Sequence, residues 1–292
     1  MTGPHHKNLF IILIISLLLP AGGCSDKRDV EVKEDRDMVK SYESVDVYGL
    51  PDFDRYGITE RKNIFFEFIR PIIRAENQRI REDKFKFRQL YARQLNGYRM
   101  TDSEKSFVRA LMDEYRVGGK LSDNSAWEVL MRRVDVVPIP LASVQAAIES
   151  GWGTSRFARI GNNLFGQWCF RESCGIVPDR RAEDAIYEVA CFRTVNESVR
   201  SYLNNLNSFS AYKHFRALRL KQRMETGSLN SYELAGKLQA YSARRNEYID
   251  ELRLMLRVNS EFFLGHCYDG LLAENDEEEE NFYSQSGTGI SH

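Results

Sequence analysis

One glutamate in this sequence of 292 residues lies where the ionisation of a carboxyl group is disfavoured. Glu149 follows an apolar stripe at helical spacing, and the dipeptide Ser150-Gly151 is expected to end that helix directly after it. A carboxylate there faces the negative end of the helix dipole and apolar neighbours. Both effects raise the pKa of a carboxyl group, which suits a general acid working near neutral pH. A glutamate at a helix end is, however, more often exposed and inert.

Two tryptophans near Glu149 have the shape needed to bind a sugar ring. Trp152 and Trp168 can supply apolar walls or stacking faces. The glycines on either side of Trp152 would let the backbone approach a bulky ligand closely. The alternative is an ordinary Gly-Trp-Gly turn around a buried indole. The segment is not a dinucleotide-binding fingerprint, because a third glycine is missing and a helix precedes it.

Several residue strings resemble one enzyme family. Residues 145–155 (QAAIESGWGTS) and 163–166 (NLFG) closely resemble the signature of bacterial endo-β-N-acetylglucosaminidases, which include autolytic and flagellar peptidoglycan hydrolases. The strings GQWC at 166–169 and GIVP at 175–178 are similar to those of the Bax-like branch. The resemblance covers about residues 137–259.

This resemblance implies a mainly α (α+β) lysozyme-like domain with a small β-hairpin beside a groove. It implies cleavage of the β-1,4 bond between N-acetylglucosamine and N-acetylmuramic acid, with Glu149 in the position of the essential acid. Gln145, Asn163 and Phe165 are expected to contact or shape the substrate site. Asn163 has a structural alternative, which is to satisfy backbone groups in a tight turn. Tyr241 matches a groove tyrosine of the family, and its alternative is packing between helices.

A second catalytic carboxylate is harder to assign. Several family members have a glutamate in the first hairpin strand, where this chain has Pro178-Asp179-Arg180-Arg181. Glu188 and Glu183 are the candidates for a base that activates water. The separation of two carboxyl groups distinguishes inverting from retaining glycosidases. If neither glutamate acts, the acetamido group of the substrate can assist a single acid.

The chain divides into five segments. Residues 1–24 contain Lys7, an apolar run and the lipobox-like string AGGC, which predict an export signal and lipid attachment at Cys24. Simple cleavage of the signal and an uncleaved anchor are the alternatives to lipid attachment. A polar tether (25–56), a helical extension (57–136), the glucosaminidase domain (137–265) and an acidic, disordered tail (266–292) are expected to follow. Ser25, and not Asp, follows Cys24, and the resemblance to bacterial lipoproteins then favours an outer-membrane location at the periplasmic face of the envelope.

The cysteine count fits an oxidising compartment. With Cys24 acylated, four cysteines remain: Cys169, Cys174, Cys191 and Cys267. Cys169 and Cys174 flank an expected turn and are the favoured disulfide pair, with buried free thiols as the alternative. A zinc site is not expected, because the chain has no CxxC pair and, beyond the signal, no paired histidines, and no cofactor is predicted.

Local signals predict most helices. Thr101 and Glu104 form a capping box, and Thr194 with Glu197 is expected to cap another helix. Pro140 is placed to begin the helix that carries Glu149. Residues 175–178 and 185–193 are expected to pair as a hairpin. Helix is expected again through Leu238 to Met255.

Charge and residue content exclude other classes of protein. The 41 basic and 42 acidic residues give a net charge of -1, so no basic face for nucleic acid is expected. The histidines beyond the signal form no obvious triad, which argues against serine or zinc hydrolases.

The expected partners are peptidoglycan strands and, through the lipid, a membrane, and the chain is expected to be a monomer. A lytic transglycosylase acting on the same polymer and a non-catalytic wall-binding lipoprotein are the alternatives to the hydrolase.

Overall fold

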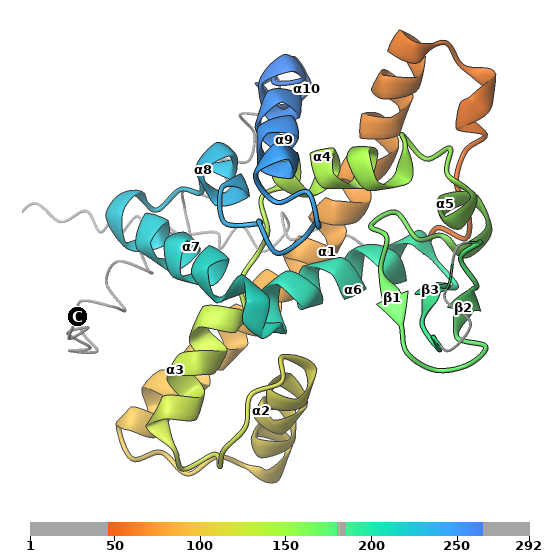
Figure 1. The fold of residues 1–292 in the computed structure, drawn as a ribbon. Helices are drawn as coiled ribbons and strands as arrows, with labels where there is room; N and C mark the ends of the chain where they lie inside the picture. Colours follow the sequence, from red (N-terminus) through yellow and green to blue (C-terminus); the bar gives the residue numbers. More distant parts are fainter. Residues whose placement is uncertain (1–45, 180, 182–184, 265–292) are drawn as a thin grey trace, which may run out of the picture. The chain divides into compact units, whose positions relative to one another are not determined.

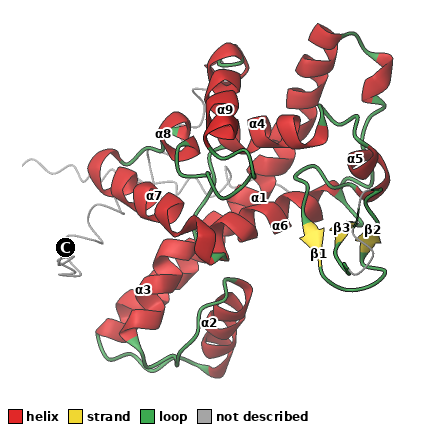
Figure 2. Ribbon diagram, in the orientation of Figure 1, coloured by secondary structure: helices red, strands yellow, loops and turns green. Residues whose placement is uncertain are grey.

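The computed structural model describes residues 46–179, 181 and 185–264, and these residues are mainly helical with one small sheet (Figures 1 and 2). The predictions for the export signal, Cys24, Glu183, Cys267 and the acidic tail lie outside the described residues. The mainly α fold class is confirmed. None of the described helices combines the length and apolarity needed to cross a bilayer.

The longest helix is α1, which runs from Ile58 to Leu95 and continues through Pro71. Its buried face packs on two helices of the predicted glucosaminidase domain, α4 (Ile139–Ser150) and α6 (Val195–Ser208). The apolar side chains of all three helices belong to one core cluster. The helical extension therefore contributes to the same core as the helix that carries Glu149.

Two shorter helices complete the extension. The helix α2 (Asp102–Glu114) begins with the predicted capping box, in which the Thr101 and Glu104 side chains each bond to the other residue's backbone amide. It ends at Glu114, before Gly118 and Gly119, because Arg116 already adopts a left-handed conformation with a φ of 56°. The helix α3 (Asn124–Arg133) brings Trp127 against the rings of α1.

The three short strands form an antiparallel sheet in the order β1-β3-β2. The predicted hairpin is confirmed as β2 (Gly175–Ile176) paired with β3 (Glu188–Ala190). The strand β1 (Trp168–Cys169) was not predicted and pairs with the other side of β3. Gly175 is required here, because a Cβ atom at that position would lie 1.9 Å from the Val189 carbonyl oxygen.

The remaining described helices follow β3, except for α5 (Arg156–Gly161), which precedes β1. Thr194 caps α6 by accepting from the Glu197 amide, as predicted. The C-terminal part contains α7 (Lys213–Thr226), α8 (Ser231–Ala235), α9 (Asn246–Val258) and α10 (Glu261–Leu264). Two 3-10 helices cover Phe53–Arg55 and Ser210–Tyr212. Contrary to expectation, residues 236–245 do not continue the helix, and this segment carries Tyr241.

Candidate active site

Glu149 is the penultimate residue of α4, which is buried on nearly all sides. Gly151 ends the helix with a φ of 56°, and Trp152 and Gly153 also have positive φ values of 60° and 80°. The fully buried Ser150 secures this turn, because its hydroxyl donates to the Ala146 carbonyl and accepts from the Gly153 amide. Glu149 is thereby held at a rigid helix end.

The Glu149 carboxyl group is half-buried beside four tyrosines from four parts of the chain. They are Tyr202 of α6, Tyr212 of a 3-10 helix, Tyr241 of the 236–245 segment and Tyr248 of α9. The 163–166 loop also lies close, because a Cβ atom at Gly166 would be 3.7 Å from Glu149 Oε2. The backbone at position 166 has a φ of 63°, a left-handed conformation that glycine adopts more easily than other residues.

Burial raises the pKa of Glu149 above its ordinary value, and the nearby Glu251 carboxylate adds to this rise. A hydrogen bond with the Tyr248 hydroxyl and the charge of Arg244 oppose it. Arg244 is itself bound to Glu251 at 2.7 Å, which limits its influence. The net effect favours the protonated carboxyl, as a general acid requires.

Burial also raises the pKa of each surrounding tyrosine, to about 12 for Tyr212. The negative charge of Glu149 acts in the same direction on all four phenols. Their hydroxyl groups therefore stay protonated at neutral pH and can act as hydrogen-bond donors, as Tyr202 does to Gln145 and Tyr241 does to the Phe165 carbonyl.

Gln145 lies one helical turn before Glu149 and has no exposed surface. Its Nε2 donates to the Tyr248 hydroxyl at 2.9 Å, and its Oε1 accepts from the Tyr202 hydroxyl at 2.6 Å. Both functional groups of the amide are used inside the protein. The predicted contact of Gln145 with substrate stays a prediction that this geometry does not support.

Asn163 organises the loop that approaches Glu149. Its amide nitrogen donates to the carbonyls of Gln167 and Ala190, both at 2.9 Å. Its oxygen accepts from the amides of Phe165 and Gln167. These contacts match the structural alternative for Asn163. Phe165 is also buried, and its ring stacks on Tyr202 with centroids 3.9 Å apart.

The two tryptophans occupy different environments. Trp152 is half-buried and packs edge-on against Phe65 and Phe66 of α1. The close backbone approach at Gly153 is made by the Phe53 ring, which lies 2.3 Å from where a Cβ atom would be. Trp168 on β1 is 50% exposed and meets Tyr187 edge-on at 4.8 Å. Of the two indoles, Trp168 is the more accessible to a ligand.

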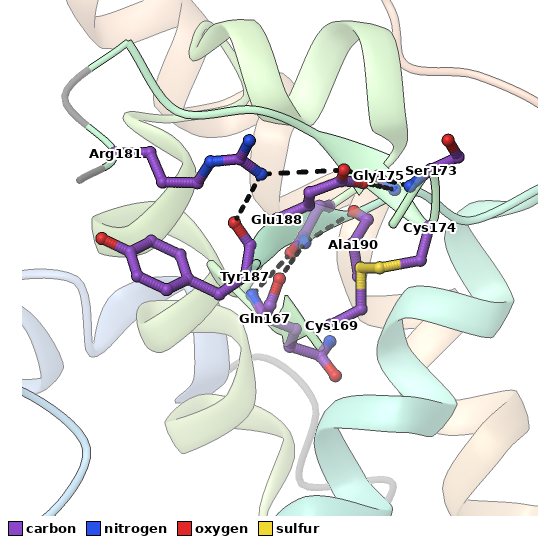
Figure 3. Close-up of a disulfide and its surroundings, with 10 residues drawn as sticks. Gln167, Cys169, Ser173, Cys174, Gly175, Arg181, Tyr187, Glu188 and Ala190 are labelled. Atoms are coloured by element: carbon purple, nitrogen blue, oxygen red, sulfur yellow. Dashed lines mark hydrogen bonds and ion pairs between the residues drawn. A yellow bond between two sulfur atoms is a disulfide. The ribbon is translucent and has the colours of Figure 1, made fainter. Parts of the chain in front are cut away.

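Glu188 supports the loop closed by a disulfide (Figure 3). The favoured pair is confirmed, because Cys169 and Cys174 are bonded. The Glu188 carboxylate accepts from the backbone amides of Ser173 and Gly175 at 3.0 and 2.7 Å, with Arg181 at 3.8 Å. These backbone hydrogen bonds and the Arg181 charge lower its pKa. Such contacts suit a structural anion better than a base, and the catalytic assignment of Glu188 stays a prediction.

Within the part of the chain that the structure describes, the residues grouped closely enough to hold a metal ion are Cys169, Cys174 and Glu188. The two sulfurs are bonded to each other and are therefore not thiolate ligands. Two surface hollows of about 610 and 400 Å³ lie elsewhere, between α1, α2 and α6 and beside α8 and α9. Glu149 lines neither, so the predicted groove over it stays a prediction.

Sequence reasoning missed three of the four tyrosines around Glu149. Tyr202 and Tyr212 lie more than fifty residues from Glu149 in the chain, and no local pattern links them to it. A partial signal existed for Tyr248, which follows the predicted Tyr241 by seven residues. The two rings are stacked with centroids 5.7 Å apart.

Comparison with known proteins agrees with the resemblance seen in the motifs. Residues 124–260 match the glucosaminidase family model, described as mannosyl-glycoprotein endo-beta-N-acetylglucosaminidase. The chain is 32% identical over 221 residues to Protein bax of Escherichia coli (strain K12), which covers 74% of this chain and 77% of that protein. The chain belongs to the glucosaminidase family. Within it, the similarity to Protein bax makes it a Bax-like member. No solved structure matches the chain.

Proposed function

We propose that this chain is a peptidoglycan hydrolase that cleaves the β-1,4 bond between N-acetylglucosamine and N-acetylmuramic acid, with Glu149 as general acid. Membership in the glucosaminidase family suggests glycosidase activity of this kind. The observation that carries the assignment is the half-buried Glu149 carboxyl, whose pKa is raised at a rigid helix end among protonated tyrosines. Its proton is available for delivery to the glycosidic oxygen as the bond breaks.

Apart from Glu183, which lies outside the described residues, the second chemical group is drawn from three candidates. Glu188 is held by backbone amides, and Tyr241 has its hydroxyl bound to the Phe165 carbonyl. The third candidate is the acetamido group of the substrate, which attacks the anomeric carbon and needs no protein carboxylate. The contacts of Glu188 favour this substrate-assisted route, with Tyr241 beside the reacting sugar.

The test is product analysis with the full-length chain purified in a mild detergent. Incubated with sacculi, it should release new reducing N-acetylglucosamine ends. Glu149→Gln should lower the rate by about 10² to 10⁴, the usual contribution of a general acid. Glu67→Gln, at an exposed position on α1, is the matched control and should keep the wild-type rate. A Glu149→Gln variant as active as wild type would refute the assignment.

One observation favours a second candidate, a lytic transglycosylase acting on the same polymer. Such an enzyme uses a single acid, and the backbone contacts of Glu188 do not suit this residue to act as a second catalytic carboxylate. Mass spectrometry of the same digest separates the two activities. Anhydromuramyl ends would identify a transglycosylase, and reducing N-acetylglucosamine ends would identify the hydrolase.

The proposed location is the periplasmic face of the outer membrane, through lipid on Cys24. Support comes from the order of Lys7, the apolar run 9–19 and the string AGGC. Cells fed labelled palmitate should label the wild-type chain and a Cys191→Ser control but not Cys24→Ser. Equal labelling of the Cys24→Ser variant would contradict the anchor.

A further inference from the structure

We propose that Tyr202, Gln145 and Tyr248 form a hydrogen-bond relay that places the acid proton of Glu149 on the carboxyl oxygen facing the substrate. The inference rests on the proposed function and adds three positioning residues to it. The relay runs from the Tyr202 hydroxyl to Gln145 Oε1 at 2.6 Å, and from Gln145 Nε2 to the Tyr248 hydroxyl at 2.9 Å. Glu149 lies one helical turn after Gln145, and its carboxyl group is next to the Tyr248 hydroxyl, which lowers the pKa of that carboxyl. The last bond of the proposed relay runs from this hydroxyl to the carboxyl group.

The chemistry of the amide gives this relay a direction. An amide side chain has one oxygen, which only accepts, and one nitrogen, which only donates. Because Tyr202 donates to the oxygen, the nitrogen is directed at Tyr248. The Tyr248 oxygen therefore accepts from Gln145, and its own proton is left for Glu149. Each bond in such a chain strengthens the next.

The direction has a consequence for the protonated carboxyl group. The Glu149 oxygen that accepts from Tyr248 acts as the carbonyl oxygen, because it already receives a proton donor. The acid proton then resides on the other oxygen. A carboxyl group free to accept or donate toward Tyr248 would spend part of its time with the proton pointing into the protein. The relay removes that unproductive state.

The packing prevents the relay from reversing. Gln145, Tyr202 and Tyr248 have no exposed surface. The Tyr202 ring is stacked on Phe165 with planes 8° apart, and the Tyr248 ring is stacked on Tyr241 with planes 6° apart. Gln145 is four residues before Glu149 on a helix whose end is secured by Ser150. The bonds from Tyr202 to Gln145 and from Gln145 to Tyr248 are direct and need no bridging water molecule.

Other groups also face Glu149 and bear on its titration. Tyr212 faces Glu149 from the 3-10 helix Ser210–Tyr212, and Tyr241 faces it from the 236–245 segment. Arg244 and Glu251 face it as a bound pair. The raised pKa values keep the tyrosines protonated, so a change in the Glu149 titration caused by relay variants reports on the relay itself.

The experiment measures the pH dependence of kcat/KM on sacculi for the full-length chain and for Tyr248→Phe, Gln145→Met and Tyr202→Phe. Loss of the Tyr248 hydroxyl removes a donor to the charged Glu149 carboxylate, and the pKa of Glu149 should rise. The alkaline limb of the kcat/KM profile should therefore move up by about one pH unit. Gln145→Met weakens the Tyr248 donor, and Tyr202→Phe frees the amide to turn its oxygen toward Tyr248. Both should move the limb in the same direction by a smaller amount, and all three should lower kcat at least about tenfold.

Two buried residues away from the site provide matched controls. Tyr115→Phe removes a buried phenol hydroxyl, and Gln222→Met removes a buried amide whose partners are Glu233 and the Asn230 amide. Neither should move the limb. An unmoved limb in both Gln145→Met and Tyr202→Phe would overturn the relay, even if Tyr248→Phe shifts. If Gln145→Met does not fold, Tyr202→Phe alone decides, since it removes only one hydroxyl.

A second readout does not depend on turnover. The ¹³C resonance of the Glu149 carboxyl, assigned by its loss in Glu149→Gln, titrates with pH in protein labelled on glutamate. The relay predicts an upward shift of this titration in all three variants, and no shift would overturn it. Failure of the proposed function appears separately, as full activity of Glu149→Gln.

Discussion

The Tyr241 hydroxyl donates a 2.9 Å hydrogen bond to the backbone carbonyl of Phe165, 76 residues earlier in the chain. This bond ties the segment between α8 and α9 to the loop that brings Gly166 against Glu149. Because the phenol proton is used by the carbonyl, the Tyr241 oxygen has only lone pairs left to offer a substrate or water molecule. Tyr241 can therefore accept a hydrogen bond from an acetamido N–H in its present state.

Replacing Tyr241 with phenylalanine should lower kcat about tenfold, because the loop beside Glu149 loses its tie and small displacements of reacting groups are costly. The free energy of unfolding should fall by only about 1 kcal/mol, the net value of one hydrogen bond. Rates on sacculi and urea denaturation measure the two effects. Tyr98→Phe is the control, since that exposed hydroxyl makes only a 3.5 Å contact with Glu104. Unchanged kcat in Tyr241→Phe would show that the tie has no role in catalysis.

Glu149→Gln should make the protein more stable at about pH 7.5 but not at about pH 3.5. Burial raises the pKa of Glu149 in the folded protein, so the folded state binds this proton more tightly than the unfolded state does. That stabilisation is complete below the ordinary pKa of a glutamate and is lost as the pH rises through the raised value. Glutamine never ionises and escapes this loss. Urea unfolding at both pH values checks it, and an equal advantage at both would indicate a packing effect.

Local features of the fold were predictable, because their causes lie within a few residues. The capping box of Thr101 and Glu104 and the Thr194 cap need only a hydroxyl and an amide one turn apart. The end of α4 at Gly151 likewise follows from glycine's tolerance of positive φ. The strand β1 has only two residues, too few to show an alternating pattern.

The surroundings of Glu149 were less predictable, because contacts between distant segments leave no local pattern. Gln145 was expected to touch substrate, and only the positions of Tyr202 and Tyr248 show that both ends of its amide are used. The glycine at 153 did indicate a close backbone approach. Its partner is Phe53, about a hundred residues upstream, and not a ligand.

Glu188→Gln should disturb the loop closed by the disulfide while changing kcat less than about tenfold, whereas loss of a catalytic base costs about 10² to 10⁴. Backbone donors lower the pKa of Glu188, so its contribution to stability is present above the ordinary pKa and lost as the pH falls through the lowered value. Hydrogen exchange at the Ser173 and Gly175 amides should therefore be faster in the variant at neutral pH and alike in both proteins in acid. A rate loss of 10² or more would instead place Glu188 in the chemistry.

Removing the Cys169–Cys174 disulfide should lower the free energy of unfolding by about 2 kcal/mol, since the loop it closes is short. Activity should fall as well, because Trp168 adjoins Cys169 on β1 and loses its fixed position against Tyr187. The double variant Cys169→Ser/Cys174→Ser tests both effects by thermal unfolding and by rates on sacculi. Cys191→Ser, which removes a free thiol, is the control and should change neither. A wild-type rate on sacculi in the double variant would show that the fixed position of Trp168 has no role in activity.

Substitution of Asn77 in α1 tests whether the helical extension belongs to the same folding unit as the candidate active site. The Asn77 side chain donates to the Val137 carbonyl at 2.8 Å and accepts from the Val137 amide at 3.2 Å, just before α4. Asn77→Ala leaves two buried backbone groups without partners and should cost about 2 to 4 kcal/mol. Asn96→Ala, which loses one exposed bond to the Ala92 carbonyl, should cost about 0.5 kcal/mol or less. Because α1 and α4 share one core, far- and near-ultraviolet circular dichroism should report a single, lowered unfolding transition in Asn77→Ala. Two separate transitions would mean that the extension folds apart from the helix that holds Glu149.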